Sequence, residues 1–246
     1  MPRLLSLLAL FTVAFPLLAD EPKKDAKDRY ETRAKYDRDG INKFYLGRQI
    51  AQVMGYAGAS WLERSEREKE EDPAKLIEAL AIKEGMVVAD VGAGSGYHSF
   101  RIAPLVGDKG KVLAVDIQQE MLDLMTARAK KEKVTNVETV LGTDKDPKLP
   151  EGKVDLIFLV DVYHEFEFPY EMTEKMVAAL KPGGRLAFVE FRLEDPKVPI
   201  KLVHKMTERQ VVKEMAEFPV LEHTKTYDKL PWQHVVIFTK KGEKKK

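Results

Sequence analysis

The residues most suggestive of chemistry begin at Asp90, which is followed by VGAGSGYHSF and thus by glycines at positions 92, 94 and 96. Glycine is needed where a backbone turns sharply and lets a ligand come within contact distance. Asp116 follows about 20 residues beyond the last of these glycines, a distance at which a carboxylate can accept hydrogen bonds from a ribose diol. A tight turn alone would explain the glycines but not the two acidic residues. The pattern therefore predicts a site for a nucleoside-containing ligand.

Two other nucleotide motifs fit this stretch less well. A dinucleotide fingerprint places its third glycine at position 97, where this chain has Tyr97. A phenol ring there would obstruct the close approach of a pyrophosphate, which weakens the interpretation as a nicotinamide oxidoreductase. A phosphate-binding P-loop needs Gly-Lys-Ser/Thr, which is absent from this segment.

A second group of reactive side chains follows later apolar runs. His164 and Glu165 come just after the run 156–160, on the side where open α/β sheets bind ligands. His164 is the best candidate for a general base because imidazole titrates near neutral pH; the alternative is a histidine that only hydrogen-bonds its loop. Glu190 is expected either to orient a reactant or to pair with Arg192. Another histidine could join His164 and Glu165 around a metal, but adjacent residues rarely chelate together, and no metal site is predicted.

The elements that must position these residues alternate between short apolar runs and amphipathic stretches. The runs are Val87–Val91, Val112–Ile117, Val137–Leu141, Leu156–Val160 and Arg185–Phe191, and helices are expected at Gln118–Lys131 and Tyr170–Leu180. Apolar strands that alternate with helices indicate a parallel sheet covered on both faces. The fold class is therefore α/β, doubly wound, around a mainly parallel sheet.

The alternation ends after the fifth strand. Thr207 and Gln210 have capping-box spacing for a helix to about Ala216. The apolar stretches Pro219–Tyr227 and Trp232–Thr239 follow with no helix between them. Strands joined by so short a connection pair antiparallel, because a parallel pair needs a crossover of about a dozen residues. The sheet is thus expected to end in an antiparallel hairpin.

The remaining segments divide the chain further. Residues 1–19 combine Arg3 with an apolar stretch and Ala19, which favours a signal peptide cleaved before Asp20, with an uncleaved membrane anchor as the alternative. A charged linker is expected at 20–39 and a helical cap at 40–72, because Ile41, Tyr45, Ile50 and Met54 lie near helical spacing. Residues 73–240 form the main domain, and 241–246 a basic tail.

Bulk composition excludes several classes of protein. The 246 residues carry a formal net charge of only +1, so no overall field attracts nucleic acid. The absence of cysteine rules out disulfides, thiolate nucleophiles and thiolate metal sites. We therefore expect no nucleic-acid partner, and a membrane partner only if the leader stays attached.

The segment from Val88 to Ile117 resembles the nucleotide-binding half of class I S-adenosylmethionine-dependent methyltransferases. The resemblance continues through Lys181-Pro182-Gly183-Gly184 and the terminal hairpin, so it covers roughly residues 73–240. It implies a seven-stranded Rossmann-like sheet, S-adenosylmethionine as methyl donor, and a small-molecule acceptor, since Asp161-Val162-Tyr163-His164-Glu165 resembles a loop of quinone-pathway C-methyltransferases.

The resemblance also implies roles for individual residues around the donor. Asp90 and the backbone of Gly92 and Gly94 would hold its methionine portion, Gly96 would permit the tight loop, Asp116 would bind the ribose, Ile117 would pack on the adenine, Asp144 would lie near the adenine amino group, and Asp161 would face the ammonium. Thr143 interrupts the family's usual Gly-Asp pairing before Asp144. His164, Glu165 and Glu190 are the catalytic candidates.

An exported leader conflicts with the supply of S-adenosylmethionine, which is made inside cells. The alternative function is therefore a non-catalytic module that binds S-adenosylmethionine. Intact Asp90, Gly92 and Asp116 favour a maintained donor site.

Overall fold

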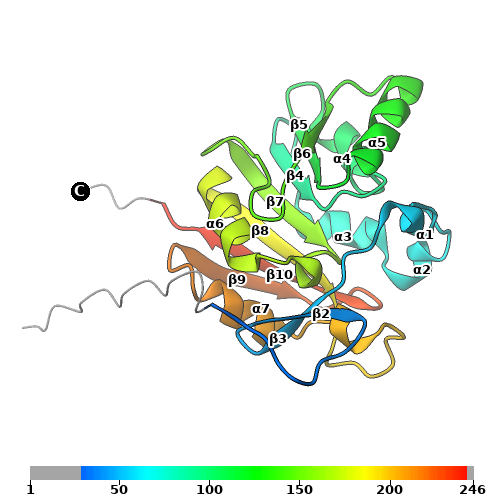
Figure 1. The fold of residues 1–246 in the computed structure, drawn as a ribbon. Coiled ribbons are helices and arrows are strands. Elements are labelled where there is room, and N and C mark those ends of the chain that lie inside the picture. The colour runs from blue at the N-terminus through cyan, green and yellow to red at the C-terminus, as the bar shows by residue number, and fades with distance from the viewer. Residues whose placement is uncertain (1–28, 243–246) are drawn as a thin grey trace, which may run out of the picture.

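The computed structural model describes residues 29–242, and its centre is a seven-stranded sheet (Figure 1). In spatial order its strands are β6 (Val137–Leu141), β5 (Lys111–Asp116), β4 (Val87–Val91), β7 (Val154–Val160), β8 (Leu180–Phe191), β10 (Gln233–Lys240) and β9 (Leu221–Tyr227). Neighbours from β6 to β8 run parallel, whereas β10 is antiparallel to both β8 and β9. The predicted mainly parallel sheet with a terminal antiparallel hairpin is confirmed.

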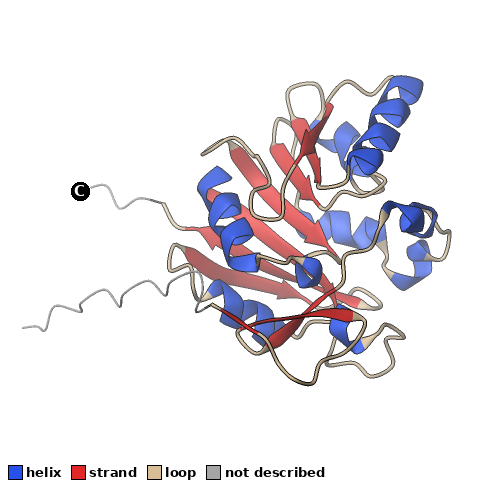
Figure 2. Ribbon diagram, viewed as in Figure 1, coloured by secondary structure: helices blue, strands red, loops and turns tan. Residues whose placement is uncertain are grey.

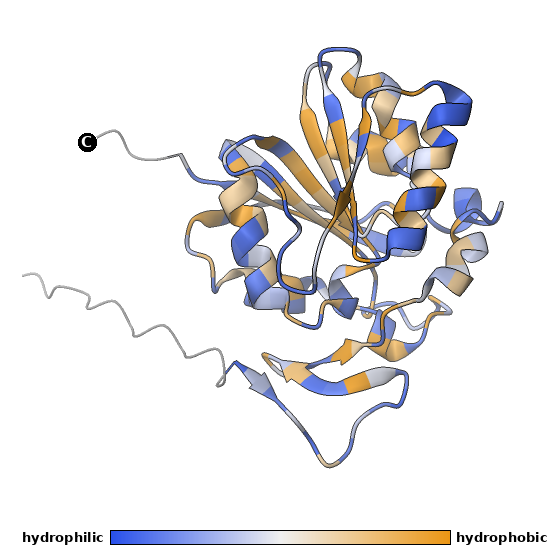
Figure 3. Cartoon of the chain, turned by 45° about the horizontal axis from the view of Figure 1, so that its top comes forward, coloured by the Kyte–Doolittle hydropathy of each residue, from blue (hydrophilic) through white to orange (hydrophobic). Residues whose placement is uncertain are grey.

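Helices cover both faces of this sheet (Figure 2). They are α3 (Pro73–Leu80), α4 (Ser99–Val106) and α5 (Gln119–Glu132) on one face, and α6 (Pro169–Ala179) and α7 (Glu208–Met215) on the other. Successive strand side chains point to opposite faces, so Val88 packs with α3 and α4 while Ala89 packs with α6 and α7. The strands are accordingly the most hydrophobic part of the ribbon (Figure 3). Thr207 caps α7 by accepting a hydrogen bond from the backbone N–H of Gln210, as its spacing predicted.

The predicted helix over 40–54 is wrong, because this segment forms strands. β1 (Tyr30–Glu31), β2 (Gly40–Tyr45) and β3 (Arg48–Ala51) make a separate three-stranded antiparallel sheet. Leu46 and Gly47 connect β2 to β3 with φ values of 47° and 94°. Two consecutive positive φ angles are typical of the two-residue hairpin turn. Of the apolar residues at helical spacing, Ile41, Tyr45 and Ile50 instead lie on two paired strands, and Met54 lies in the segment that follows β3.

The cap and linker boundaries therefore change. Residues 56–70 do hold the short helices η2 (Tyr56–Gly58), α1 (Ala59–Leu62) and α2 (Arg67–Glu70). The small sheet is not a detached cap, since Tyr45 and Ile50 are buried in the core that α6 and α7 cover. The charged linker also ends earlier than expected, because Tyr30 pairs with β2 and donates a hydrogen bond from its hydroxyl to Glu171 of α6 at 2.5 Å.

The signal peptide or anchor predicted at 1–19 and the end of the basic tail, 243–246, lie outside the described residues. Within residues 29–242, no helix is both long and apolar enough to span a bilayer.

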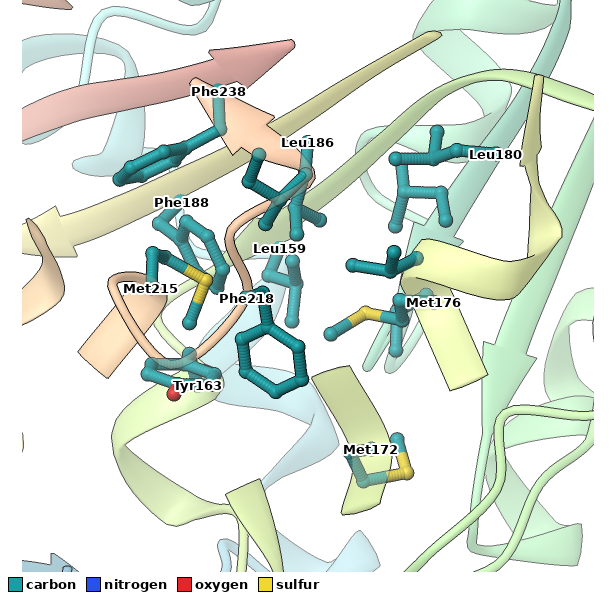
Figure 4. Packing of buried hydrophobic residues seen from close by; sticks show 14 of the residues in the cluster. Leu159, Tyr163, Met172, Met176, Leu180, Leu186, Phe188, Met215, Phe218 and Phe238 are labelled. Carbon is teal, nitrogen blue, oxygen red and sulfur yellow. The ribbon is translucent and has the colours of Figure 1, made fainter. Parts of the chain in front are cut away.

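The core next to the candidate site is built from large side chains of β7, β8, α6, α7 and β10 (Figure 4). Tyr163 begins the short helical turn η3 (Tyr163–Glu165) and is fully buried in this core. Its ring centroid lies 4.7 Å from that of Phe188 on β8. Burying an aromatic ring of this size fixes the turn that carries His164 and Glu165.

Candidate active site

A cavity of about 720 Å³ lies at the carboxyl ends of the central parallel strands. Its wall includes Gly92 after β4, Asp116 at the end of β5, and residues 160–162 and 164–167 from the end of β7 and the loop that follows it. Open α/β sheets bind ligands at this edge because the connecting loops diverge there. The glycine loop and the histidine-containing loop, which are distant in sequence, thus share one cavity.

The glycine loop adopts the conformation that its composition predicts. Gly92, Gly94 and Gly96 have φ values of 78°, 55° and 81°, in the left-handed region that favours glycine. A Cβ atom at Gly96 would lie only 2.8 Å from the ring of Phe100 and 2.9 Å from the side chain of Met125. Gly96 therefore lets the loop pack closely on α4 and α5, in agreement with the role expected for it, while Gly92 and Gly94 line the cavity.

Asp116 ties the end of β5 to the glycine loop. One carboxylate oxygen accepts from the backbone N–H of Gly94 at 2.9 Å, and the other accepts from that of Gln118 at 2.9 Å. Burial raises the pKa of Asp116, and these backbone hydrogen bonds offset part of the rise. Each carboxylate oxygen can accept a second hydrogen bond, so the geometry leaves room for a ribose diol.

Asp90 lies away from the cavity wall. Its carboxylate accepts a 2.7 Å hydrogen bond from the hydroxyl of Ser99 at the start of α4, and it is not among the described residues that line the cavity. Burial raises its pKa to about 7. The expected contact between Asp90 and the methionine portion of the donor thus gains no support from the geometry, which instead places Asp90 as a link between β4 and α4.

The other three residues expected around the donor all line the cavity. Ile117 is 45% exposed there, an unusual exposure for an isoleucine that an adenine ring would cover. Asp144 is an exposed side chain on the loop after β6. Asp161 is half-buried: its Oδ2 accepts from Gln233, while its buried Oδ1 has no hydrogen-bond partner among the described residues. A buried oxygen without a partner fits a bound ammonium group, and these features together fit S-adenosylmethionine.

The conformation and charge of Asp161 are also unusual. Its φ of 53° is rare outside glycine, and its backbone N–H is held by the carbonyl of Val189 at 2.8 Å. Burial, together with the nearby acidic Glu71 and Glu190, raises the pKa of Asp161 well above its ordinary value. A cationic ligand at this position would stabilise the ionised carboxylate.

The three catalytic candidates lie together, and Glu190 supports His164 directly. Glu190 Oε2 lies 2.5 Å from His164 Nδ1, and Glu190 Oε1 accepts from the backbone N–H of Tyr163 at 3.1 Å. The expected alternative, a salt bridge between Glu190 and Arg192, is wrong: the Arg192 guanidinium donates to the backbone carbonyls of residues 230, 231 and 233. A carboxylate at Nδ1 holds that proton on the ring and leaves the Nε2 lone pair free.

His204 completes the cluster from η4 (Leu202–His204). Its Nδ1 lies 3.2 Å from His164 Nε2 and 3.7 Å from Glu165 Oε1. Burial, and then the proximity of His164, lower the pKa of His204 to about 4. Burial raises the pKa of Glu165 to about 7, although the nearby His164 opposes the rise. Burial thus favours the uncharged form of both side chains.

Two long-range contacts fix the histidine loop in place. Arg48 of β3 forms a buried ion pair with Glu214 of α7, at 2.7 Å between Nε and Oε1. The same guanidinium donates to the backbone carbonyl of His164 at 3.1 Å. The small N-terminal sheet therefore positions the reactive loop, although the two are more than 100 residues apart in sequence.

The segment that follows β3 contacts both the histidine loop and the residues just after β5. The backbone N–H of Met54 donates to Glu165 Oε2 at 3.3 Å, and the Met54 carbonyl accepts from Gln118 at 3.1 Å. The Gln118 side chain also accepts from the backbone N–H of Tyr56 at 2.7 Å. Residues 52–54 line the cavity, so this segment, here called the covering segment, forms part of the wall between the glycine loop and the histidine loop.

Three residues of the cavity wall carry no motif that marks them in the sequence. His204 is one of them, and it contacts His164. Gln118 carried no motif signal. Arg67 belongs to the charged stretch 63–72, but its buried side chain lines the cavity and pairs with Glu71 at 2.7 Å. A single sequence offers no signal for these residues, because each reaches the site through tertiary packing.

Comparisons with known proteins agree with this geometry. Residues 82–242 match the family described as the methyltransferase domain. The chain belongs to this family of S-adenosylmethionine-dependent methyltransferases. A solved S-adenosylmethionine-dependent methyltransferase from Aquifex aeolicus superposes with a TM-score of 0.71 at 26% identity, covering 76% of this chain and 99% of that one. The predicted class and fold are thus confirmed.

Curated relatives match only a part of the chain. A demethylmenaquinone methyltransferase from Lactococcus lactis is 26% identical over 127 residues, which are 52% of this chain and 50% of that protein. A protein-L-isoaspartate O-methyltransferase 2 from Archaeoglobus fulgidus is 30% identical over 113 residues, 46% of this chain and 49% of that protein. The chain spans about half the length of these relatives, and their names differ in the acceptor.

Proposed function

We propose that this methyltransferase transfers the methyl group to a small-molecule acceptor held inside the cavity. The observation that carries the proposal is the shared cavity, in which Gly92 and Asp116 lie in the same wall as His164 and Glu165. Its volume of about 720 Å³ is within the range of small-molecule sites, roughly 300–1,000 Å³. The donor must occupy part of this volume, so the space that remains suits a small acceptor better than a folded protein.

The chain's own residues would bind the donor from several sides. Asp116 would accept the ribose hydroxyls, Ile117 would cover one face of the adenine, and Asp161 would receive the ammonium on its partnerless oxygen. Asp144, which lines the cavity on the loop after β6, would reach the adenine edge. S-adenosylmethionine supplies an electrophilic methyl group on its sulfur. The methyl group is transferred by in-line displacement, with S-adenosylhomocysteine as the leaving group.

The acceptor must be aligned with that methyl group and, in many cases, must lose a proton. An imidazole whose Nδ1–H donates to Glu190 presents a lone pair at Nε2, where either a proton or a metal ion can bind. Of the two, the role of His164 as general base is the one that its residue type predicts. The covering segment 52–54 would exclude water from the reacting groups.

Support for a small, partly apolar acceptor comes from the wall of the cavity around the cluster. Val53, Met54, Phe166, Phe191 and Ile200 contribute apolar surface there. One relative is named for a quinone-type acceptor, demethylmenaquinone, which suits such a wall. A phenol, quinol or similar apolar molecule with one ionisable group is the acceptor class that we propose.

The first experiment is calorimetry of the full chain with S-adenosylmethionine and S-adenosylhomocysteine. Both should bind in a 1:1 ratio. The bound enzyme is then incubated with separate pools of phenols, quinols, thiols and proteins, and S-adenosylhomocysteine release is measured. Release with the phenol and quinol pools supports the proposal. Release only with the protein pool would overturn the small acceptor, and binding without turnover on any pool would favour a non-catalytic binding module.

The export of the protein also stays a proposal. We infer from the apolar stretch at 1–19 that the mature chain begins near Asp20. Expression in a host with a secretory pathway, followed by intact mass measurement, tests this. A full-length product in the cytoplasm would contradict it.

A further inference from the structure

Three side chains in the cavity present potential metal ligands to one another. His164 Nε2 lies 3.2 Å from His204 Nδ1, and Glu165 Oε1 lies 3.7 Å from His204 Nδ1 and 4.0 Å from His164 Nε2. All three residues line the cavity, and their three atoms lie within 4.8 Å of one another. This trio, here called the HHE cluster, comes from the loop after β7 and from η4.

These separations match the spacing of ligands around a small cation. Zinc–nitrogen bonds of about 2.0–2.1 Å at a tetrahedral angle hold two ligand nitrogens about 3.4 Å apart. The two imidazoles of the HHE cluster are already at this spacing. The Glu165 oxygen would need to approach by only a few tenths of an ångström, about what a rotation of its carboxylate provides.

The residues behind the HHE cluster prepare it as an outer shell does. A metal-binding histidine almost always donates its second ring N–H to a carboxylate or carbonyl, which fixes the tautomer. Glu190 is fully buried and holds His164 Nδ1 at 2.5 Å, so Nε2 faces His204 with its lone pair. Glu165 is prepared in the same way, because Met54 occupies Oε2 and leaves Oε1 for the cluster.

A bound cation would also balance the carboxylate charges around the HHE cluster. Glu165 and Glu190 contribute two carboxylates, and both side chains are buried. The pair Arg48–Glu214 compensates itself, and its guanidinium reaches only the backbone carbonyl of His164. A divalent ion would balance two ionised carboxylates without leaving a net charge in a desolvated place.

We infer that His164 Nε2, His204 Nδ1 and Glu165 Oε1 bind one divalent transition-metal ion of the zinc type in this cavity. Two imidazoles and one carboxylate suit zinc or ferrous iron, and three protein ligands leave a position open to the cavity. The adjacency of His164 and Glu165 in sequence, which argued against a metal, is overcome because the turn η3 directs both side chains toward His204.

The open coordination position would bind the hydroxyl of the acceptor and lower its pKa, as a bound metal does for water. This reaction step extends the proposed function and is the only part of the inference that rests on it. Because the metal would occupy His164 Nε2, it would replace the general-base role of that nitrogen. The proton would pass to solvent, the acceptor oxygen would form its bond to the methyl carbon, and the sulfur–methyl bond would break to leave S-adenosylhomocysteine. Atoms and charge balance without any oxidant or reductant.

The test uses the full chain without a histidine tag, stripped of metal by a chelator, and titrates it with zinc chloride in a calorimeter. The expected result is 1:1 binding that His164→Ala or His204→Ala removes. Glu190→Gln should weaken the affinity by about 10–100-fold, the effect typical of an outer-shell change. His223→Ala is the matched control, because His223 lies on β9 and outside the cavity wall; it should bind zinc as the unmodified chain does.

Two results would overturn the metal site: no zinc binding by the unmodified chain, or equal binding by the His204→Ala variant and the control. His204 is less buried than His164, so His204→Ala decides the question if His164→Ala fails to fold. S-adenosylhomocysteine binding, measured on the same metal-free samples, separates the two hypotheses. If the chain binds zinc but not S-adenosylhomocysteine, the proposed function is wrong. If it binds S-adenosylhomocysteine but not zinc, the metal site is wrong.

Discussion

The two parts of the cavity are built in opposite ways. Most of the cofactor part, comprising Gly92, Gly94, Asp116, Ile117 and Gln118, comes from one stretch of chain, in which β4, α4 and β5 follow one another, while Asp144 and Asp161 join it from the ends of β6 and β7. The acceptor part comprises the HHE cluster and the covering segment 52–54, which come from three distant stretches. Local turns and adjacent strands fix the first part, whereas packing between remote elements fixes the second. Mutations should therefore separate donor binding from turnover.

The largest expected effect is on turnover in the acceptor part. His164→Ala should lower turnover by roughly 10²–10⁴-fold, because the acceptor loses the group that promotes loss of its proton, either directly as a base or as a ligand of the metal. S-adenosylhomocysteine affinity should stay nearly unchanged, since the contact is needed only in the transition state. Steady-state kinetics with the acceptor found by the screen, and calorimetry on the same samples, measure the two quantities. Equal losses in both would mean that His164 only shapes the loop that begins at Asp161.

The long-range support of the acceptor part comes next. Arg48→Met leaves the carboxylate of Glu214 buried without its partner, which should destabilise the fold by about 3–5 kcal/mol in urea unfolding. Replacing both residues, as Arg48→Met with Glu214→Leu, should recover most of that stability because no isolated charge remains. Turnover of the double variant should stay low, since His164 still lacks the guanidinium that holds its carbonyl. Full turnover there would show that β3 does not position the loop.

A smaller effect is expected in the cofactor part. Asp116→Ala should weaken S-adenosylhomocysteine binding by about 1.5–3 kcal/mol for each lost charge-assisted hydrogen bond, less whatever water recovers. Zinc binding by the HHE cluster should be unaffected, because Asp116 contributes no ligand to it. An unchanged affinity would show that the ribose binds elsewhere. A parallel loss of zinc binding would contradict the separation of the two parts.

The last expected effect concerns the pH dependence of stability and involves Asp90, which lies outside the cavity wall. Burial raises the pKa of Asp90 to about 7 from an ordinary value of 3.8. The folded state therefore binds this proton more tightly than the unfolded state, and the stability it supports falls as pH rises from about 4 to about 7. Asp90→Asn should flatten this decline, and urea unfolding at several pH values measures the difference. An identical slope in both proteins would mean that Asp90 ionises normally.

Most of the α/β framework followed from the sequence. The run Val87–Val91 became β4 with the same bounds, and the hairpin of β9 and β10 followed from the lack of a crossover. Gly92 and Gly96 marked the loop because only glycine adopts its backbone angles freely. Each of these features depends on neighbours in sequence, such as strand periodicity, turn composition or the length of a connection.

The wrong predictions, a helix over 40–54 and a linker up to 39, concern segments whose structure depends on residues far away in sequence. Ile41, Tyr45 and Ile50 match helical spacing, but the turn at Leu46-Gly47 folds them into a hairpin whose apolar side packs on a remote core. Tertiary context overrides local propensity in this way when burial outweighs the preference of the backbone. The charged stretch before position 40 likewise gains a strand only because β2 lies beside it.

What the sequence by itself determined is the donor side: a glycine loop between a strand and a helix, with Asp116 at the end of the next strand. Only the tertiary structure decided the acceptor side. It placed Glu190 beside His164 rather than Arg192, and it brought His204 within 3.2 Å of His164 across 40 residues of chain. On the donor side, it also placed Asp90 outside the cavity wall. The physical reason is the separation along the chain over which each kind of interaction acts. Backbone geometry and side-chain period act over a few residues, whereas a cluster of titratable groups forms where separate elements happen to pack.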